Sequence, residues 1–278
     1  MTDVISPTAS ASTDATQSAR ETYDSLAEVY DAYTAADDYD RWSSMLNAVI
    51  EEIVGVRAVG RTLLDAACGT GKSTFALADR GYEVSGFDIS SAMIEQARSK
   101  ASPEQASRLW VDDMTDFHVP QPYDVITCLD DAVNYVLNPA DLHAMFARVS
   151  ESLSPGGIFA FDVNSRRTYE THWLTDSVDD SSGNVVFARR SLTPEPFRPE
   201  QLSSFMLYSF IPDTSRTSWR QLVCTHTERH YTADWLTSAL RHHGLRPVRT
   251  MGLHDSGTFD THLDETFHTK AVHFAVKD

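Results

Sequence analysis

Hydrophobic residues in the first two thirds of the chain form two kinds of pattern in regular alternation. Short apolar runs predict buried strands at 62–66, 83–87, 109–111, 125–128 and 158–163. Apolar residues three and four positions apart predict amphipathic helices between them, and a particularly clear helical pattern, from Trp42 to Ile53, precedes the first strand. This alternation implies right-handed crossovers and a mainly parallel sheet with helices on both faces.

The pattern changes after Arg166. A short helical segment comes first, and strand-like runs separated by proline-rich or polar turns then predict an antiparallel insert at 185–190, 205–211 and 219–227. A helix capped by Thr232 and two closing strands at 245–251 and 271–276 complete the sheet. At the other end of the chain, residues 1–18 are rich in Ser, Thr and Ala and carry no periodic apolar residues, so we expect a disordered tail there.

Composition narrows the class of protein. A length of 278 residues with 41% hydrophobic residues allows one sizeable domain with additions. The formal net charge of −17, without a basic cluster, disfavours a nucleic-acid partner because its phosphates would be repelled. Three widely spaced cysteines fit a reduced thiol state. With no apolar span long enough for a bilayer and no basic-then-apolar leader, we expect a cytoplasmic protein with no membrane partner.

A glycine-containing turn follows the first predicted strand, within the segment 63–73. Gly69 and Gly71 let the backbone turn sharply and approach a ligand, and the next helix points free N–H groups at it. A phosphate-binding P-loop needs glycine where this chain has Ala66, and the dinucleotide fingerprint needs its third glycine where this chain has Thr74. ATP and NAD are therefore both disfavoured.

The turn resembles motif I of the class I S-adenosylmethionine-dependent methyltransferases, with Asp65, Ala67, Gly69 and Gly71 in register. In that family the turn holds the methionine part of the cofactor, and the core is Rossmann-like. The resemblance covers roughly residues 20–277, strongly in the first half and loosely in the insert. It implies S-adenosylmethionine as the cofactor and S-adenosylhomocysteine as the product.

Asp88 ends the second predicted strand, where the strand ends of a doubly wound sheet border the ligand crevice. A carboxylate there can accept hydrogen bonds from both ribose hydroxyls. We therefore assign Asp88 to the cofactor site, together with the nearby Ile89 and Met93. The alternative is that Asp88 caps the helix that begins at Ser91.

Further positions resemble the family's cofactor contacts. The resemblance implies that Asp113 binds the adenine amino group and that the Met114 backbone meets the ring, with Asp112 as the alternative acid. It also implies that Leu129 packs against the cofactor. Tyr39 lies in a segment similar to the family's Tyr-x-x-Trp entry helix and would close over the cofactor; a buried helical face is the alternative for this segment.

The segment 128–135 leaves the fourth predicted strand where the cofactor and substrate halves of the crevice meet. It resembles the family's Cys-Leu-x-Asp-Ser-Leu-Asn-Tyr type of segment. We assign Asp130 and Asp131 to catalysis and Asn134 to the acceptor, with an aspartate that caps the following short helix as the alternative. His226 is a third catalytic candidate, as the general base for a hydroxyl acceptor.

Aromatic and polar residues of the first helices and of the region after the fifth strand are candidates for the acceptor pocket: Tyr33, Asn164, Tyr169 and Trp173. His226, Glu228 and His230 alternate along one strand and so share a face. This trio could hold a metal, but it has no cysteine partner and no helical His-Glu motif, so we expect no metal site. A solvated sheet face is the other explanation.

We therefore predict an α/β fold with a doubly wound, seven-stranded, mainly parallel sheet. Its units are a disordered tail (1–18), an N-terminal helical cap (19–58), a cofactor-binding core (59–165), an antiparallel insert that forms a substrate lid (166–231), and a C-terminal helix with the closing strands (232–278). The cap and the insert would cover the same crevice and exclude water and bulky polymers.

The predicted activity is transfer of a methyl group from S-adenosylmethionine to an N, O or C nucleophile of a small organic acceptor, such as a specialised metabolite. Two alternatives remain open. One is a methyltransferase fold that binds the cofactor but catalyses a cyclisation or serves as a binding module. The other is an NAD-dependent oxidoreductase. A monomer and a homodimer are both compatible with the sequence.

Overall fold

A mainly parallel sheet forms the centre of the computed structural model, which describes residues 8–180, 184–255 and 257–278, with the backbone alone for 8–14. Its strands are β1 (Thr62–Ala66), β2 (Glu83–Asp88), β3 (Leu109–Val111), β4 (Tyr123–Cys128), β5 (Leu153–Asn164), β10 (Leu245–Leu253), β11 (Phe259–Asp260) and β12 (Lys270–Lys277). They lie in the order β11-β10-β12-β5-β4-β1-β2-β3. Strands β1 to β5 are parallel, and β12 joins β5 antiparallel.

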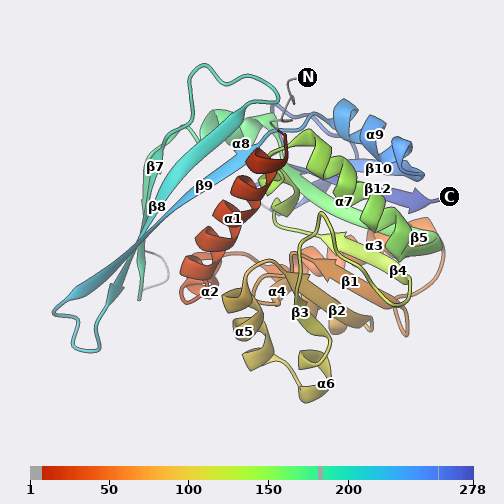
Figure 1. Ribbon diagram of the computed structural model, residues 1–278, viewed down its shortest axis with the longest axis horizontal. Coiled ribbons are helices and arrows are strands. Elements are labelled where there is room, and N and C mark those ends of the chain that lie inside the picture. Colours follow the sequence, from red (N-terminus) through yellow and green to blue (C-terminus); the bar gives the residue numbers. More distant parts are fainter. Residues whose placement is uncertain (1–7, 181–183, 256) are drawn as a thin grey trace, which may run out of the picture.

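Helices cover both faces of this sheet (Figure 1). The helices are α1 (Thr8–Leu26), α2 (Tyr30–Tyr33), α3 (Tyr39–Val54), α4 (Lys72–Ala78), α5 (Ser91–Lys100), α6 (Pro103–Ala106), α7 (Pro139–Ser152), α8 (Arg166–Thr171) and α9 (Ala233–His242), with a 3-10 helix η1 (Ala132–Tyr135). Side chains alternate across β1: Leu63 packs with the residues of α3 and α4, and Leu64 packs with those of α7 and α9. The predicted doubly wound α/β fold is confirmed.

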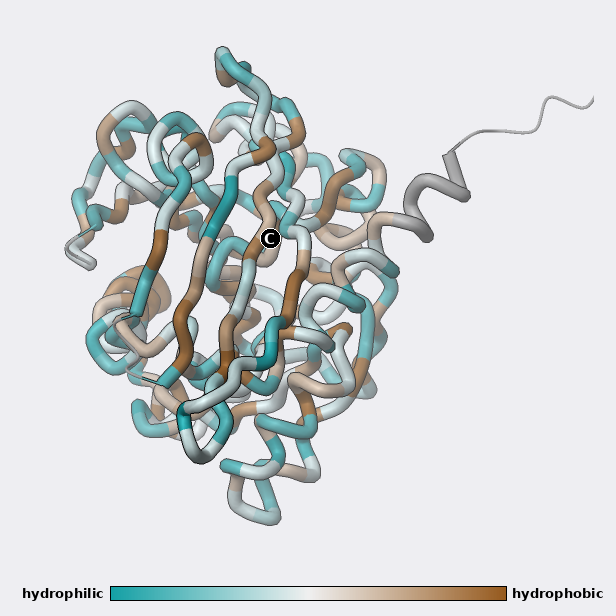
Figure 2. The backbone as a smooth tube through the Cα atoms, turned by 90° about the vertical axis from the view of Figure 1, so that its left-hand side faces the viewer, coloured by the Kyte–Doolittle hydropathy of each residue, from teal (hydrophilic) through white to brown (hydrophobic). Residues whose placement is uncertain are grey.

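A second, antiparallel sheet is inserted between α8 and α9. Its strands, in spatial order, are β6 (Ser177–Asp179), β7 (Val186–Ser191), β8 (Leu202–Pro212) and β9 (Trp219–Arg229). Along β8, buried residues such as Phe205 and Leu207 alternate with more exposed ones. Figure 2 shows hydrophobic and hydrophilic stretches along the strands that face the viewer. The buried face packs on Leu26 and Val29 of the N-terminal cap.

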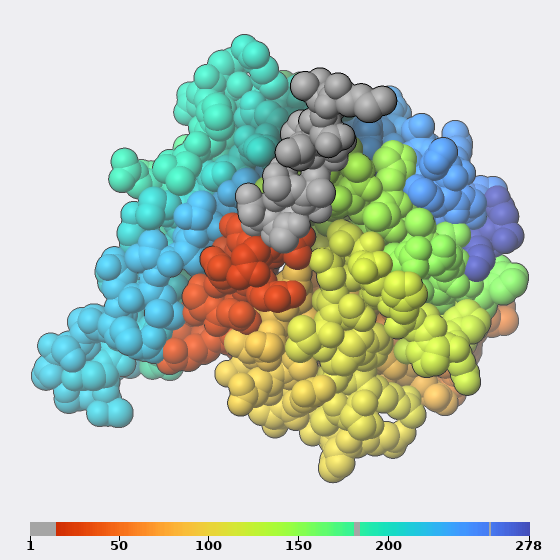
Figure 3. All heavy atoms as spheres, in the orientation of Figure 1, coloured from red at the N-terminus to blue at the C-terminus, as the bar shows by residue number. Residues whose placement is uncertain are grey.

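Helix α1 lies between the two sheets. It packs against β9 on one side and α5 on the other, as Figures 1 and 3 show. The Oδ1 atom of Asp24 accepts a hydrogen bond of 2.6 Å from the Ser90 hydroxyl, and the Thr22 hydroxyl donates to the Thr225 carbonyl oxygen at 3.0 Å. The cap therefore joins the insert to the core through side-chain bonds as well as apolar contacts.

The sequence-based element boundaries were wrong in several places. A disordered tail was expected over 1–18, but helix α1 begins at Thr8; residues 1–7 lie outside the described part of the chain. The main sheet has eight strands instead of seven because the two-residue strand β11 pairs with β10. Strand β5 starts at Leu153 instead of the predicted residue 158, and a register shift against β4 accommodates the extra residues. No helix in the described segments is both long and apolar enough to cross a membrane.

Asp65 connects three parts of the core. It is 1% exposed in β1, and its carboxylate accepts hydrogen bonds from the hydroxyls of Ser73 at 2.8 Å, Thr74 at 2.6 Å and Thr127 at 2.7 Å. Burial raises the pKa of Asp65, whereas these three hydroxyls oppose the rise. The carboxylate thus holds α4 and β4 against β1.

We expect Asp65→Ala to lower the free energy of unfolding by about 2–4 kcal/mol, because the buried hydroxyls of Thr74 and Thr127 and the partly buried hydroxyl of Ser73 lose their acceptor. Urea denaturation would measure the change. Glu95→Ala, at an exposed position of α5, is the control and should change the free energy by less than about 0.5 kcal/mol. Equal stability of the two variants would contradict the structural role of Asp65.

Candidate active site

A cavity lies beyond the carboxyl ends of the parallel strands β1 to β4, under helix α1. Ala19 and Tyr23 of α1 line it from above. Its other walls come from the loops that follow the four strands: Ala67, Cys68, Gly69, Thr70, Lys72, Ser73, Asp88, Ile89, Asp112, Asp113, Met114, Thr115, Leu129 and Asp130. In Figure 3 the red cap lies directly beside the yellow-green loops of this region. This is the strand-end crevice in which doubly wound folds bind ligands.

The turn after β1 is built from left-handed backbone. Ala67 has a φ of 58°, Gly69 of 53° and Gly71 of 83°. A Cβ at Gly71 would overlap the ring of Phe75, so glycine is needed there for space as well as for conformation. The turn carries its backbone N–H groups along the cavity wall, and one of them, from Gly69, is bound by Asp88.

Asp88 ends β2 and is 7% exposed. Its Oδ2 atom accepts the Gly69 N–H at 2.8 Å, and its Oδ1 atom accepts the Ser90 N–H at 2.9 Å. Burial raises the pKa of Asp88 to about 6, although these two N–H groups oppose the rise. The side chain of Ser90 itself caps α5 by accepting the Met93 N–H, so the interpretation of Asp88 as the helix cap is wrong.

Two aspartates follow β3, and both line the cavity. Asp112 uses both of its carboxylate oxygens, one for Trp110 Nε1 at 3.0 Å and the other for the Asp113 N–H at 2.9 Å. Asp113 accepts the N–H and the hydroxyl of Thr115 through one oxygen, Oδ1, at 2.8 Å each. This arrangement leaves Asp113 the better placed of the two to accept a further bond from a ligand.

Three residues predicted to contact the cofactor do not line this cavity. Asp65 and Met93 are 1% and 0% exposed, within the core. Gly71 begins α4 with its Cα against Phe75. We therefore correct their predicted roles: they shape the turn and the helix behind the cavity wall. The remaining predicted residues line it: Tyr39, Ala67, Gly69, Asp88, Ile89, Asp113, Met114 and Leu129.

A second, wider cavity adjoins the first, between the cap, the end of β5 and the insert. Some of the residues that line it were predicted, namely Tyr33, Asn164, Trp173, His226 and Asp131. Five residues line both cavities: Tyr23, Tyr30, Tyr39, Asp130 and Tyr135. Four tyrosines and one carboxylate therefore surround the junction through which the two cavities meet.

The junction is held in place by contacts among these residues. The Tyr39 hydroxyl donates to Asp130 Oδ2 at 2.6 Å. The ring of Tyr23 meets that of Tyr135 edge-on, with centroids 5.2 Å apart. Burial raises the pKa of Tyr39 well above its usual range, and the charge of Asp130 adds to the rise, so the phenol stays neutral at physiological pH. Aromatic faces and a carboxylate form a suitable environment for a cation.

A buried ionic cluster positions Asp130. Asp130 and Asp131 both have left-handed backbone, with φ of 58° and 52°. Asp162 stabilises this conformation because its two carboxylate oxygens accept the N–H of Asp130 at 2.8 Å and that of Asp131 at 3.0 Å. Lys270 Nζ then donates to Asp162 Oδ2 at 2.8 Å and to Asp131 Oδ1 at 2.6 Å, and lies 4.0 Å from Asp130 Oδ1.

Lys270 was not singled out in the sequence. The available signal was a lysine at the start of a mainly apolar strand. In the structure, Lys270 pairs with Asn164 of the neighbouring strand β5. Burial opposes the charge of Lys270, but Asp131, Asp162 and Asp130 outweigh burial and raise its pKa well above the usual range. Burial likewise raises the pKa of Asp162 to about 6, against the opposing charge of Lys270. One ammonium thus partly compensates three carboxylates.

Comparisons with known proteins agree with this geometry. A model of the methyltransferase domain matches residues 63–157. A protein named as a methyltransferase in Geobacillus sp. (strain WCH70) is 29% identical over 222 residues, covering 78% of this chain and 88% of that protein. The crystal structure of an S-adenosylmethionine-dependent methyltransferase from Clostridium acetobutylicum ATCC 824 is 26% identical, with a TM-score of 0.74, and the match covers 91% of this chain and 98% of that one.

This chain belongs to the class I S-adenosylmethionine-dependent methyltransferases. The methyltransferase uses S-adenosylmethionine as its cofactor, as the sequence predicted. It is also similar to the dTDP-4-amino-2,3,4,6-tetradeoxy-D-glucose N,N-dimethyltransferase of Saccharopolyspora spinosa, with 27% identity over 231 residues, 79% of this chain and 85% of that protein. These findings support methyl transfer over the cyclisation, binding-module and NAD-dependent alternatives.

Strand β9 and His230, the residue after it, carry a buried polar face beside the second cavity, which we call the acceptor cavity. His226, Glu228 and His230 are 3%, 1% and 1% exposed, so the interpretation as a solvated sheet face is wrong. His226 Nδ1 lies 2.6 Å from the Tyr135 hydroxyl, and burial lowers the pKa of His226 to about 4, although Asp131 opposes the fall. The imidazole is therefore neutral at pH 7.

Glu228 is the second polar group on this face. Its Oε2 atom accepts hydrogen bonds from Asn164 Nδ2 at 2.9 Å and from the Tyr169 hydroxyl at 2.7 Å. Burial raises the pKa of Glu228 well above its usual range, and the neighbouring Asp131 raises it further. These effects favour the protonated form of Glu228 and the charged form of Asp131, whose pKa is lowered mainly by the charge of Lys270 against its burial.

Two predicted acceptor residues, Asn134 and Tyr169, do not line either cavity. Asn134 is 0% exposed, donates to the Arg229 carbonyl oxygen at 2.8 Å and accepts the Asn164 N–H at 2.9 Å. Tyr169 is also 0% exposed, and its hydroxyl donates to Glu228. We correct their predicted roles: both residues support the walls of the acceptor cavity of the methyltransferase from behind.

We expect Lys270→Met to lower the free energy of unfolding of the methyltransferase by about 3–5 kcal/mol at pH 8, because buried carboxylates lose their counter-charge. Without the lysine, these carboxyls have folded-state pKa values above the unfolded ones, so the penalty grows as the pH rises and shrinks as they bind protons. Urea denaturation should therefore give a smaller loss at pH 5.5. Adding Asp162→Asn should recover part of the loss at pH 8. An equal loss at both pH values would show that the buried charges are not its cause.

Proposed function

We propose that this methyltransferase transfers a methyl group to the amino group of a small molecule. The observation that carries the proposal is the junction of the two cavities, where Asp130 and four tyrosines are shared. On the acceptor side, Asp37 and Asp131 add carboxylates to the wall. A protonated amine is attracted to these carboxylates, whereas a phenolate placed beside them is repelled.

The proposed cofactor pose assigns a role to each part of the first cavity. Asp88 accepts bonds from the ribose hydroxyls, Asp113 accepts the adenine amino group, and Met114 and Leu129 pack on the ring. The turn around Gly69 holds the methionine part. This pose directs the sulfonium methyl group at the junction, where the tyrosine faces and Asp130 stabilise its positive charge.

In the proposed reaction, the lone pair of the amine attacks the methyl carbon in line with the carbon–sulfur bond. The new N–C bond forms as the C–S bond breaks, and sulfur leaves as the neutral thioether of S-adenosylhomocysteine. Holding the two reactants in near-attack geometry can supply about 7–11 kcal/mol of the barrier. Before the attack, the bound ammonium group gives one proton to Asp130, which frees this lone pair; the pKa of Asp130 is raised by burial against the opposing effects of Lys270 and Tyr39. The methylated nitrogen then carries the positive charge that the sulfonium loses.

The walls of the acceptor cavity support a small acceptor. Helix α1 covers the cofactor, and Arg189, Phe205 and His226 of the insert form the opposite wall of the acceptor cavity. The amino-sugar N,N-dimethyltransferase of Saccharopolyspora spinosa is consistent with an amino sugar as the acceptor class. The net charge of −17 disfavours nucleic acids, and the free cysteines are compatible with the cytoplasm.

The direct test is a panel of amino sugars, other small amines and phenols, each incubated with the enzyme and methyl-labelled S-adenosylmethionine, with products identified by mass spectrometry. We expect label on nitrogen. Label on phenolic oxygen alone would refute the amine proposal while leaving the methyltransferase activity in place.

We expect Asp88→Asn to weaken S-adenosylhomocysteine binding about 10- to 150-fold, which corresponds to about 1.5–3 kcal/mol for hydrogen bonds to a charged group. Because the pKa of Asp88 is about 6, wild-type affinity should be full above pH 6 and fall up to tenfold per pH unit below it. The affinity of the Asp88→Asn variant should lack this fall at low pH, because the amide does not titrate. Isothermal titration calorimetry measures both effects. Asp116→Asn removes the same charge at an exposed position outside the cavity and should bind as the wild type does.

We expect Asp130→Asn to lower kcat for an amine acceptor about 10²- to 10⁴-fold, because it removes the proton acceptor at the junction. S-adenosylhomocysteine affinity should change by much less. Tyr39→Phe, which removes only the hydrogen bond to Asp130, should lower kcat by a smaller factor. Steady-state kinetics at saturating cofactor would measure both. If kcat stays unchanged in Asp130→Asn while KM alone rises, the carboxylate binds the acceptor and takes no part in proton transfer.

A further inference from the structure

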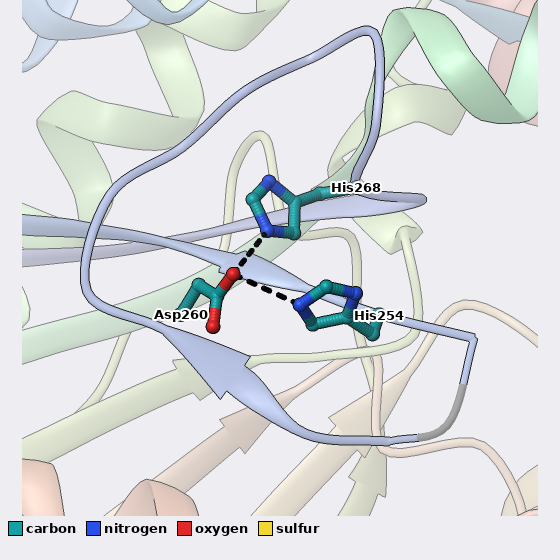
Figure 4. A group of neighbouring side chains, drawn as sticks. All are labelled: His254, Asp260 and His268. Carbon is teal, nitrogen blue, oxygen red and sulfur yellow. Dashed lines mark hydrogen bonds and ion pairs between the residues drawn. The ribbon is translucent and has the colours of Figure 1, made fainter.

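Two histidines and one aspartate meet beside the acceptor cavity, in the segment that joins β10 to β12 (Figure 4). His254 follows β10, Asp260 ends β11 and His268 precedes β12. Asp260 Oδ2 lies 2.9 Å from His254 Nε2 and 3.1 Å from His268 Nε2. One ligand atom of each residue lies within 4.8 Å of the other two. No motif relates the three positions, so the sequence did not point to them.

The spacing of these atoms is close to that of a tetrahedral metal site. Zinc–nitrogen and zinc–oxygen distances of about 2.0–2.2 Å place any two ligands roughly 3.3–3.5 Å apart. The two nitrogen–oxygen distances given above are slightly shorter, so small outward movements of the side chains would admit an ion. Two imidazoles and one carboxylate are also a ligand set that borderline divalent metals prefer.

The imidazoles are held in position before any ion arrives. The ring of His268 lies against the backbone of Gly252, where a Cβ would overlap it. His268 Nδ1 lies 2.9 Å from the Asp264 N–H nitrogen and 3.1 Å from the Asp264 carbonyl oxygen. The ring of Phe267, a 59% exposed residue, packs edge-on against both imidazoles, with centroids 5.0 Å from His254 and 5.3 Å from His268. A preorganised ligand set of this kind lowers the entropic cost of binding.

We propose that His254, Asp260 and His268 form a binding site for one divalent metal ion of the zinc class. The ligands are the two Nε2 atoms and the Asp260 carboxylate, and water completes the coordination. Without the ion, the same residues form the hydrogen-bonded group that Figure 4 shows, with protons on the Nε2 atoms directed at Asp260 Oδ2. When the ion binds, the His268 proton moves to Nδ1, which gives up the hydrogen bond from the Asp264 N–H and donates to the Asp264 carbonyl oxygen at 3.1 Å.

The site stabilises one rim of the acceptor cavity. His254 lines that cavity together with the neighbouring Leu253 and Thr269, whereas none of the three ligands lines the cofactor cavity. An ion would therefore fasten the segment 257–268 to the end of β10. It should slow amide exchange in that segment and leave S-adenosylhomocysteine affinity unchanged.

The test uses full-length protein without a histidine tag, stripped with a chelator and titrated with ZnCl₂ by calorimetry and with CoCl₂ by visible absorption. The informative variants are His254→Ala and Asp260→Asn, because both side chains are partly exposed and their loss should leave the fold intact. His262→Ala is the matched control: it removes an exposed histidine of the same segment, and within the described part of the chain the side chain of His262 is hydrogen-bonded to its neighbour Thr261. His143→Ala tests a competing surface group, since His143 Nδ1 lies 3.0 Å from His243 Nε2.

We expect one Zn²⁺ per wild-type chain, cobalt absorption of a four- or five-coordinate site, and at least tenfold weaker binding in His254→Ala and Asp260→Asn. His262→Ala and His143→Ala should bind as the wild type does. Hydrogen exchange of 257–268 should slow with Zn²⁺ in the wild type and not in Asp260→Asn. Wild-type affinity in both ligand variants, or affinity lost in His143→Ala instead, would overturn the proposal, whatever acceptor the enzyme uses.

Discussion

The active site depends on one carboxylate, that of Asp162. It accepts the N–H groups of Asp130 and Asp131, whose backbone is left-handed, and it accepts a hydrogen bond from the ammonium of Lys270. These bonds connect the turn after β4 with the ends of β5 and β12. Burying such a cluster is costly, and apolar residues of similar volume often give greater stability. The cluster instead fixes the position of Asp130. Left-handed backbone at two aspartates persists only where the surroundings impose it, and this backbone conformation directs Asp130 into the junction.

The cap gives this geometry its second constraint. Asp31 accepts the Thr70 hydroxyl at 2.6 Å and pairs with Lys100 at 2.8 Å, while Lys72 donates to the Thr34 carbonyl oxygen at 2.8 Å. Asp31 and Lys72 thus fasten the cap to the core. Together with the Asp24–Ser90 bond, these contacts hold the cap so that three of its tyrosines line the cofactor cavity, namely Tyr23, Tyr30 and Tyr39. The junction is therefore assembled from the cap and the core, and neither forms it alone.

The sequence predicted what is local. The turn at Gly69, the acid at Asp88 and the strand–helix alternation are each set by neighbours along the chain, and they located the cofactor cavity. The sequence could not show that Lys270 of β12 binds Asp162 of the neighbouring strand β5. It also could not show that His226 and Glu228 face inward, because a period of two shows that side chains share a face but not which way that face points. The part of helix α1 before residue 19 was missed for a related reason: it has no apolar stripe, and Ala15 and Thr16, which lie over the cavity, are small residues.

The inserted sheet has a hydrophobic cluster of its own, built from Phe187, Phe205 and Leu207 with Trp173 and the end of α1. The insert also shares no strand with the main sheet. Substitutions on its inner face can therefore alter the acceptor cavity while the cofactor turn keeps its packing. For engineering, this separation makes Arg189 and Phe205 natural positions for saturation libraries: acceptor scope can be varied there without rebuilding the cofactor pocket.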